Sequence, residues 1–447
     1  MQLYPPEAVT DIARRLQAAG FQAWAVGGAV RDALLGNPHS DWDLATSARP
    51  EDVRRIFRRT VPVGIEHGTV GVLARDGVLY EVTTFRRDVA TDGRHATVAF
   101  ADTLEEDLAR RDFTINAIAW HPLTEELRDP HGGMQDLRDA VLRTVGAPAE
   151  RFAEDYLRVL RALRFAGHYV LTIDPPTWTA LVAAVPGLGG LSAERVREEL
   201  VKILTKTRHA SAPLKLYAAS GALRALLPEL HALIGFTVSA GGGAAADVWE
   251  ETLTAVDALA RSRPRLRLAA LLHAVGMPAA RTRDLRGGWR VTGHETAGAR
   301  RAADVMQRLR ASNAETEDVT RLVRLQNELF PPDAPPALVR RWLAEVEPGF
   351  VPDLFRLRFA LWRARPVAGG AADLVERWRM VRRVLRERPP LAVSDLALDG
   401  SDLKQLGLRP GPEFGIILRR LLERVWDEPA LNERERLLHI VRTELLP

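Results

Sequence analysis

The sequence predicts an α+β protein, with an α/β head at the N-terminus and an all-helical remainder. Up to about residue 150, short runs rich in β-branched residues alternate with helical patterns, and beyond it apolar residues recur at helical spacing. At 447 residues the chain is long enough for two to four domains. We expect a head over residues 1–146, a helical neck over 147–238, a helical body over 247–330 and a helical tail over 337–447.

The composition is that of an ordinary globular protein, with 46% hydrophobic and 27% charged residues. The formal net charge is +4 and the sequence pI is about 9.6, which is compatible with a polyanionic partner without requiring one. Cysteine is absent, so disulfides and thiolate zinc sites are excluded. The sequence shows no signal-peptide core and no apolar stretch of membrane-spanning length, and we therefore expect a cytoplasmic protein.

The elements expected in the head follow from local patterns. A helix that ends at Gly20 and a helix with Pro50 in its first turn are typical helix signals, and the β-branched runs predict strands. The predicted helices cover residues 7–19 and 49–59, and the predicted strands cover 23–26, 61–72 and 78–85.

One stretch of the head carries an arrangement suited to phosphate chemistry. A strand ends at Gly27-Gly28, a short helix carries Arg31-Asp32, and the next predicted strand carries Asp41 and Asp43. Alternate strand residues share a face, so these two aspartates point one way and Trp42 points the other. Two carboxylates on one face repel unless a cation lies between them, and a Gly-Gly turn allows the backbone to approach phosphate. The pattern predicts a Mg²⁺ site for a nucleoside triphosphate.

Two alternatives stay open at this site. An isolated Asp-x-Asp is more often a capped surface loop, and the Gly-Gly-x-x-Arg-Asp set upstream is what favours the metal site. Glu81, in the neighbouring predicted strand, is either a third carboxylate at the metal or a side chain that faces solvent.

A second functional pattern lies on a predicted helix over Phe152–Phe165. Leucines at helical spacing define its buried face, while one aspartate and three arginines recur every three residues around the other side. Arginines on adjacent turns repel one another, so the stripe favours an anionic partner such as a triphosphate over water. A surface helix with salt bridges is the alternative. The polar residues of this stripe are Asp155, Arg158, Arg161 and Arg164.

An aspartate next to an arginine also has the chemistry to choose a base. Cytosine and adenine both present an exocyclic amine beside an unprotonated ring nitrogen, which suits one carboxylate and one guanidinium. Uracil and guanine present the opposite polarity, and each mispaired group costs about 1–3 kcal/mol. Asp155 with Arg158 would therefore admit CTP and ATP and reject UTP and GTP without a nucleic-acid template.

These motifs resemble those of the class II tRNA nucleotidyltransferases, the CCA-adding enzymes, in the polymerase-β-like superfamily. GGAVRD with DWDLAT resembles motif A, RRDFTINA at 110–117 is similar to motif B, and EDYLR at 154–158 resembles motif D. The resemblance implies a polymerase-β-like head, and Mg²⁺ bound by Asp41 and Asp43. It further implies that the nucleotide is bound by Gly28, Arg31, Arg111, Asp155, Arg158, Arg161 and Arg164. Leu191–Leu204 resembles motif E and is expected to be structural.

Further stretches extend the resemblance along the chain. Thr84–Phe100 is similar to the flexible loop of CCA-adding enzymes, and its retention favours a protein able to add A. Leu396–Leu438 resembles the tail of bacterial members, in which basic helices can follow RNA phosphates or simply face solvent. We expect tRNA to bind there.

The body resembles the helical framework of a metal-dependent HD phosphohydrolase domain, but it lacks part of that domain's set of metal ligands. The HD dipeptide stands as His273-Ala274, Glu251 occupies a position where a ligand histidine is expected, and Asn327 occupies the last ligand position. Alanine cannot bind a cation, which leaves His273 and His294 without enough partner ligands. We interpret the region as a degenerate scaffold without hydrolase activity.

The sequence as a whole predicts an enzyme that adds CCA, or part of it, to the 3′ end of tRNA from CTP and ATP. The expected mechanism uses two Mg²⁺ and releases pyrophosphate. One alternative is an enzyme that adds only A and works with a separate CC-adding enzyme. The others are a poly(A) polymerase and, without catalysis, an inactive RNA-binding module.

Overall fold

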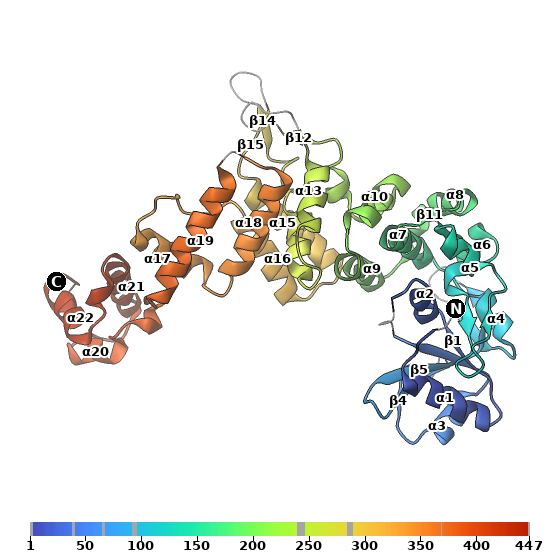
Figure 1. The fold of residues 1–447 in the computed structure, drawn as a ribbon. Helices are drawn as coiled ribbons and strands as arrows, with labels where there is room; N and C mark the ends of the chain where they lie inside the picture. Colours follow the sequence, from blue (N-terminus) through green and yellow to red (C-terminus); the bar gives the residue numbers. More distant parts are fainter. Residues whose placement is uncertain are drawn as a thin grey trace. The chain divides into compact units, whose positions relative to one another are not determined.

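The protein divides into two compact units, an N-terminal unit over Met1–His231 and a C-terminal unit over Ala232–Pro447. The structure is a computed structural model and describes residues 3–37, 41–64, 68–91, 96–238, 246–283, 289–367 and 369–445. The predicted fold class is confirmed, because a sheet near the N-terminus is followed by a largely helical remainder (Figure 1). The predicted division into four domains stays a prediction.

A seven-stranded sheet forms the frame of the N-terminal unit, in the order β3-β4-β5-β2-β1-β8-β9. Its neighbours are antiparallel except β2 and β5, which are parallel with Leu44 opposite Val82. In the β1–β2 pair, Asp43 lies opposite Val26, so the start of β2 adjoins the turn that follows β1. The strands are β1 Ala23–Val26, β2 Asp43–Thr46, β3 Thr60–Pro62, β4 Thr69–Leu73, β5 Leu79–Thr84, β8 Ala119–Trp120 and β9 Leu127–Arg128.

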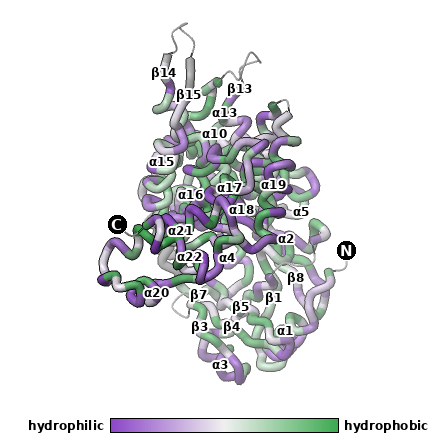
Figure 2. The backbone as a smooth tube through the Cα atoms, turned by 90° about the vertical axis from the view of Figure 1, so that its left-hand side faces the viewer, coloured by the Kyte–Doolittle hydropathy of each residue, from purple (hydrophilic) through white to green (hydrophobic). Residues whose placement is uncertain are grey.

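Apolar side chains are buried on both faces of this sheet. One core takes side chains from α1 Glu7–Ala18, α2 Gly28–Leu34 and α3 Pro50–Ile56, and also contains Trp42 and Leu44. A second core, on the opposite face, contains Ala45 and residues of α4. Figure 2 marks the strands as largely hydrophobic and α3 as largely hydrophilic, as expected for a sheet covered by amphipathic helices.

Two predicted elements of the head are corrected by the structure. The strand expected over 61–72 is two antiparallel strands, β3 and β4, because Gly64 and Gly68 take positive φ values of 115° and 82° that end strand geometry. The helix expected over 49–59 ends at Ile56. The loop expected within 84–100 is flanked by a hairpin of β6 Arg86–Thr91 and β7 Ala96–Phe100, and its centre lies outside the described residues.

The predicted single helix over Phe152–Phe165 is wrong, because it is broken at Asp155. The chain forms α6 Pro148–Glu154, then Asp155 in an extended conformation with φ −155°, then α7 Leu157–Tyr169. The Asp155 carboxylate accepts a hydrogen bond of 3.0 Å from the Leu157 N–H at the start of α7. Aspartate is poor inside a helix and good at its start, since its short side chain competes for backbone N–H groups.

The helix predicted over 191–204 is confirmed as α9, with Ser192 accepting from the Arg195 N–H at its start. The other elements of the N-terminal unit are α4 Leu104–Ala109, the 3₁₀ turn η2 Thr114–Asn116, α5 Gly133–Arg138, β10 Val141–Leu142, β11 Thr172–Ile173, α8 Pro175–Ala184, η3 Val185–Gly190, α9 Ala193–Lys206, α10 Ser211–Ser220, α11 Ala222–Leu226 and α12 Pro228–His231.

The C-terminal unit is built mainly from packed helices. Helices α13, α14, α16 and α18 contact one another, and α17 contacts α19 and α21. Its elements are β12 Thr237–Val238, β13 Ala246–Asp247, α13 Val248–Asp257, α14 Pro264–Leu272, β14 Arg281–Arg283, β15 Trp289–Val291, α15 His294–Arg308, α16 Asn313–Leu325, α17 Pro336–Val346, α18 Val351–Ala364, α19 Gly370–Arg386, η4 Val393–Asp395, α20 Gly400–Gln405, α21 Pro412–Asp427, η5 Pro429–Leu431, α22 Arg434–Ile440 and η6 Val441–Leu445.

Two stretches of the chain have a composition that is typical of linkers, one rich in Gly and Ala and one rich in Pro. Most of the Gly/Ala-rich stretch at 239–247 lies outside the described residues. The Pro-rich stretch at 331–336 is a loop within the C-terminal unit, and its Ala334 is buried in a core shared with α17, α18 and α19. No helix in the described ranges is long and apolar enough to cross a membrane.

The contact of α5 with the η2 turn depends on a glycine. A Cβ atom on Gly133 would lie 2.1 Å from the carbonyl oxygen of Thr114, so only glycine allows this approach. We expect Gly133→Ala to destabilise the protein by about 1–3 kcal/mol in denaturant unfolding. Gly189→Ala is the control, because nothing lies within 4 Å of its Cβ position. Equal loss of stability in both variants would contradict this account.

Candidate active site

A pocket of about 660 Å³ lies in the N-terminal unit over the face of the sheet that carries Asp43. Its walls come from β1, β2, β4, β5 and α2, from the segment after α4, and from α7 and α9. Seven of the residues expected to bind metal or nucleotide line it, namely Gly28, Arg31, Asp43, Arg111, Asp155, Arg158 and Arg161. Stretches far apart in sequence are therefore brought together as one site.

The acidic side of the pocket is formed where β2 begins. Trp42 and Leu44 are buried in the core on the other face, so Asp43 between them faces the pocket. Asp41 precedes β2 rather than lying in it and is exposed, which corrects the prediction of both aspartates on one strand. Glu81 lines the same pocket from β5.

Negative charge accumulates around Asp43. Burial, together with the charges of Glu81 and Asp41, raises its pKa to about 6, and the charge of Arg111 opposes them. A carboxyl group in this state is stabilised either by a proton or by a cation. In the part of the chain that the structure describes, no three His, Asp or Glu side chains are arranged to hold a metal by themselves.

The turn after β1 brings an arginine against the backbone. Gly27 has a φ of 72°, and a Cβ atom there would lie 2.7 Å from the Nη1 of Arg111. Arg111 donates to Asp107 at 3.0 Å and to the Asn116 carbonyl at 3.3 Å. Its buried Nε has no hydrogen-bond partner among the described residues. This arginine, beside the Gly-Gly backbone, has donor capacity for an anion.

Arg31, in contrast, is largely occupied by the protein. It is only 5% exposed and donates to Asp32 at 2.9 Å, to the Tyr169 hydroxyl at 2.6 Å and to the Asn116 side chain. These bonds tie α2 to the η2 turn and to α7. Arg31 lines the pocket, but most of its guanidinium holds the walls together.

The arginines on α7 do not form the unpaired stripe that the sequence predicts. Each one meets a carboxylate that lies outside α7, which removes most of the expected repulsion. The pairs are Arg158 with Glu154, Arg161 with Asp112 at 2.7 Å and Arg164 with Glu199 at 2.6 Å.

The three arginines of α7 also differ in where they lie. Arg158 and Arg161 line the pocket, whereas Arg164 is buried against α9 and does not line it. Asp155 also lines the pocket, and its carboxylate binds Arg195 of α9 at 2.7 Å rather than Arg158. The expected nucleotide-binding roles of these residues stay predictions.

Asp112 connects the segment after α4 to α7. Burial by itself would raise its pKa, but the charge of Arg161 and a hydrogen bond from Asn116 lower it to about 2. The Asp112–Arg161 pair is therefore fully charged at neutral pH despite its burial.

Two residues of the site were not anticipated. Arg195 lines the pocket and binds Asp155, although its helix was expected to be only structural, and the Tyr169 hydroxyl joins Arg31 to Asp32. No local pattern marks either residue, since each acts through a partner at least 40 positions away.

Comparison with known proteins bears on the same part of the chain. Residues 23–143 match the poly(A) polymerase head domain, and residues 171–234 match the probable RNA and SrmB-binding site of polymerase A. A CCA-adding enzyme of Enterococcus faecalis is 49% identical over 195 residues, which cover 43% of this chain and 48% of that protein. The N-terminal half of the chain is thus similar to the tRNA nucleotidyltransferase and poly(A) polymerase family.

The relatives differ in how much of the chain they match. A CCA-adding enzyme of Geobacillus stearothermophilus is 45% identical over 228 residues, covering 51% of this chain and 55% of the relative. The chain thus matches about half the length of these curated relatives. In fold, the crystal structure of the Bacillus stearothermophilus CCA-adding enzyme in complex with CTP is similar over 98% of both chains, with a TM-score of 0.76 and 29% identity.

The depressed pKa of Asp112 predicts a pH-dependent contribution to stability. A pKa lowered from 3.8 to about 2 corresponds to about 2 kcal/mol of stability, present above pH 4 and lost as the pH falls toward 2. Asp112→Asn should therefore destabilise the protein by about that amount at pH 7, and its difference from wild type should shrink below pH 4. Denaturant unfolding at a series of pH values measures this, with Asp11→Asn, at a partly exposed position, as control. A difference that stays constant down to pH 3 would contradict the charge state.

Proposed function

We propose that the protein is a tRNA nucleotidyltransferase that adds CCA, or part of it, to the 3′ end of tRNA. It takes CTP and ATP as substrates, uses no nucleic-acid template and releases pyrophosphate. The observation that carries this proposal is one pocket that combines the carboxylate of Asp43 with the Asp155 and Arg158 side chains. The similarity to a CCA-adding enzyme solved with CTP supports it.

The acidic side of the pocket fits divalent cations. Carboxylate oxygens are the ligands Mg²⁺ prefers, and the raised pKa of Asp43 reflects negative charge that a cation would offset. Asp41 and Asp43 would hold two Mg²⁺, which when bound lower the pKa of the attacking 3′-hydroxyl and neutralise the triphosphate. Glu81 adds negative charge on the same side.

The phosphates would lie between this acidic side and the turn after β1. The Gly27-Gly28 backbone and the unpartnered Nε of Arg111 offer donors to phosphate oxygens. No covalent protein intermediate is needed, since catalysis follows from positioning and charge stabilisation. Arg31 contributes mainly by holding these walls in place.

Base choice would depend on Asp155 and Arg158. The Asp155 carboxylate already accepts from the Leu157 N–H and from Arg195, yet a carboxylate has about four acceptor sites, so capacity remains for an exocyclic amine. Arg195 binds Asp155 and Glu154 binds Arg158, so each of the two side chains is held by a charged partner. This orientation would supply in the protein the discrimination that a template strand supplies in a polymerase.

Two other functions would use the same site and the same chemistry but would give a different product. Addition of A alone, with a separate CC-adding enzyme, uses the same pocket, and the centre of the loop that bears on this choice lies outside the described residues. A poly(A) polymerase is disfavoured by the curated relatives reported above, which carry the name CCA-adding enzyme. The cytoplasmic location stays a prediction.

One assay separates these products. The purified protein receives tRNA transcripts that lack CCA or end in CC, with labelled CTP or ATP and Mg²⁺. We expect CTP and then ATP to be incorporated to complete CCA. Incorporation of ATP alone onto the CC transcript would identify an A-adding enzyme, and long A tails on any RNA would identify a poly(A) polymerase. No incorporation at all would refute the proposal.

Asp41→Ala and Asp43→Ala are the controls that connect this activity to the acidic side of the pocket. Both should abolish incorporation and leave tRNA binding largely intact, because they remove metal ligands and not RNA contacts. Retained activity in either variant would show that the proposed metal site is wrong.

A separate prediction concerns base choice. Arg158→Ala should relax selectivity more than it weakens triphosphate binding, so the ratio of UTP to CTP incorporation should rise by about tenfold or more, as expected when one recognition contact is lost. Arg54→Ala, on the exposed side of α3, is the control for loss of one positive charge. Unchanged selectivity with reduced overall rate would assign Arg158 a structural role instead.

A further inference from the structure

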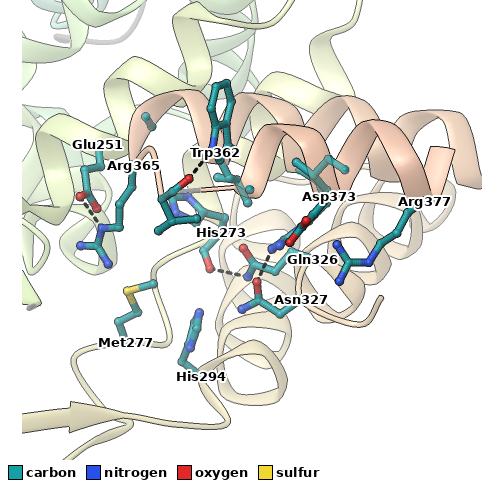
Figure 3. A pocket seen from close by; sticks show the side chains of 16 residues that line it. Glu251, His273, Met277, His294, Gln326, Asn327, Trp362, Arg365, Asp373 and Arg377 are labelled. Atoms are coloured by element: carbon teal, nitrogen blue, oxygen red, sulfur yellow. Dashed lines mark hydrogen bonds and ion pairs between the residues drawn. The ribbon is translucent and has the colours of Figure 1, made fainter. Parts of the chain in front are cut away.

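A second pocket, of about 440 Å³, lies wholly within the C-terminal unit (Figure 3). Its walls come from α13, from the turns after α14 and α16, and from α15, α18 and α19. This volume is in the range of small-molecule sites in proteins. The proposed function makes no use of this pocket.

The residues at the degenerate HD positions converge here, but they are engaged in other ways than metal binding. Glu251 accepts from the Nε of Arg365 at 2.5 Å. Burial lowers the pKa of His273 to about 4, and its Nδ1 lies 2.8 Å from the Ala270 carbonyl oxygen. Asn327 accepts a hydrogen bond from Arg358. The guanidinium groups of Arg365 and Arg358 therefore occupy oxygen atoms of Glu251 and Asn327 that a bound metal ion would need as ligands.

Arginine is the dominant charge of the pocket. Arg358, Arg365 and Arg377 line it together with the carboxylates of Glu251 and Asp373. Because Arg365 is paired with Glu251, the remaining lining charges are two guanidiniums against the exposed Asp373. The lining therefore carries a net positive charge.

Two of these arginines lie close to each other without full compensation. Burial and the charge of Arg377 lower the pKa of Arg358, and the negative charge of Glu295 raises it. Glu295 also accepts a hydrogen bond from the side-chain amide of Asn327. Arg377 uses its Nε on the Phe330 carbonyl at 2.7 Å, an uncharged partner. An anion placed between Arg358 and Arg377 would relieve their repulsion.

Two buried polar atoms of the lining also lack partners. The Nε of Arg358 and the Nε2 of His294 make no hydrogen bond within the described part of the chain. An unpaired buried donor costs about 1–3 kcal/mol, so such atoms mark places where a ligand supplies the missing partner. Both belong to side chains that line this pocket.

One wall is suited to a flat ring. Trp362 lines the pocket (Figure 3), as do Leu361 and Leu374, and the Trp362 Nε1 donates to the Val367 carbonyl at 3.4 Å. An aromatic side chain beside cations is the combination on which nucleotide bases stack while their phosphates pair with guanidinium groups.

From this arrangement we propose that the pocket binds a nucleotide, with its phosphate between Arg358 and Arg377 and its base against Trp362. The phosphate belongs either to a free mononucleotide or to a phosphodiester of a bound RNA, since both present the same chemistry. The degenerate HD framework has thereby become an anion site. This binding is separate from nucleotidyl transfer and does not rest on it.

The test uses the full chain and four probes: inorganic phosphate, AMP, adenosine and a 3′-blocked oligoadenylate of five residues. Binding is followed by hydrogen exchange of residues 351–386, which reports on α18 and α19 independently of any nucleotide bound in the N-terminal unit. We expect AMP to protect this segment and adenosine to protect it far less. Arg377→Gln should weaken AMP binding at least tenfold, whereas Arg379→Gln, an exposed arginine on the same helix, should leave it unchanged.

Further variants separate the parts of the site. Arg358→Gln should act like Arg377→Gln, and Trp362→Ala should weaken AMP binding without affecting inorganic phosphate. Protection by AMP at least equal to that by the oligonucleotide identifies a mononucleotide site, and protection by the oligonucleotide alone identifies an RNA site. Absence of protection with every probe, or wild-type binding in both arginine variants, overturns the proposal. Circular dichroism confirms that each variant is folded.

Discussion

The ion pair between the buried Asp112 and the partly exposed Arg161 is the interaction on which the N-terminal site depends. It joins the segment after α4, which also carries Arg111 and Asn116, to α7, which carries Arg158. A buried pair of this kind adds little net stability compared with apolar packing, but breaking it by removing one partner is costly. It therefore fixes the position of α7 against the sheet, and with it the distance between the acidic end of the pocket and the end that carries Asp155 and Arg158.

Two aspartates of this pocket have pKa values that are shifted in opposite directions by their surroundings. Burial raises the pKa of Asp43, and the nearby Glu81 and Asp41 add to that effect. Asp112 is buried as well, but the guanidinium of Arg161 more than offsets the burial and lowers its pKa. Negative charge is thus left uncompensated where a cation would bind and is fully compensated where only rigidity is needed.

The two units use arginine in contrasting ways. On α7 each arginine has its own carboxylate, which lets several guanidiniums line one wall without strong repulsion. In the described part of the C-terminal unit, no carboxylate forms an ion pair with Arg358 or Arg377, and buried polar atoms of the lining stay unpaired there. The first arrangement is a preorganised wall, and the second is a site that an anion completes.

The sequence by itself determined the features that depend on near neighbours. It predicted the strand before Gly27-Gly28, the capped start of α9 at Ser192 and the change from strands to helices, because hydrophobic period, turn residues and capping act over a few positions. Most of the site residues that it predicted do line the pocket. Only the tertiary structure decided the pairing of Asp155 with Arg195 and of Arg161 with Asp112, and the withdrawal of Arg164 from the pocket. The physical reason is range: these partners are separated by 35 to 49 positions, and a charge selects whichever opposite charge the packed backbone brings within a few ångströms.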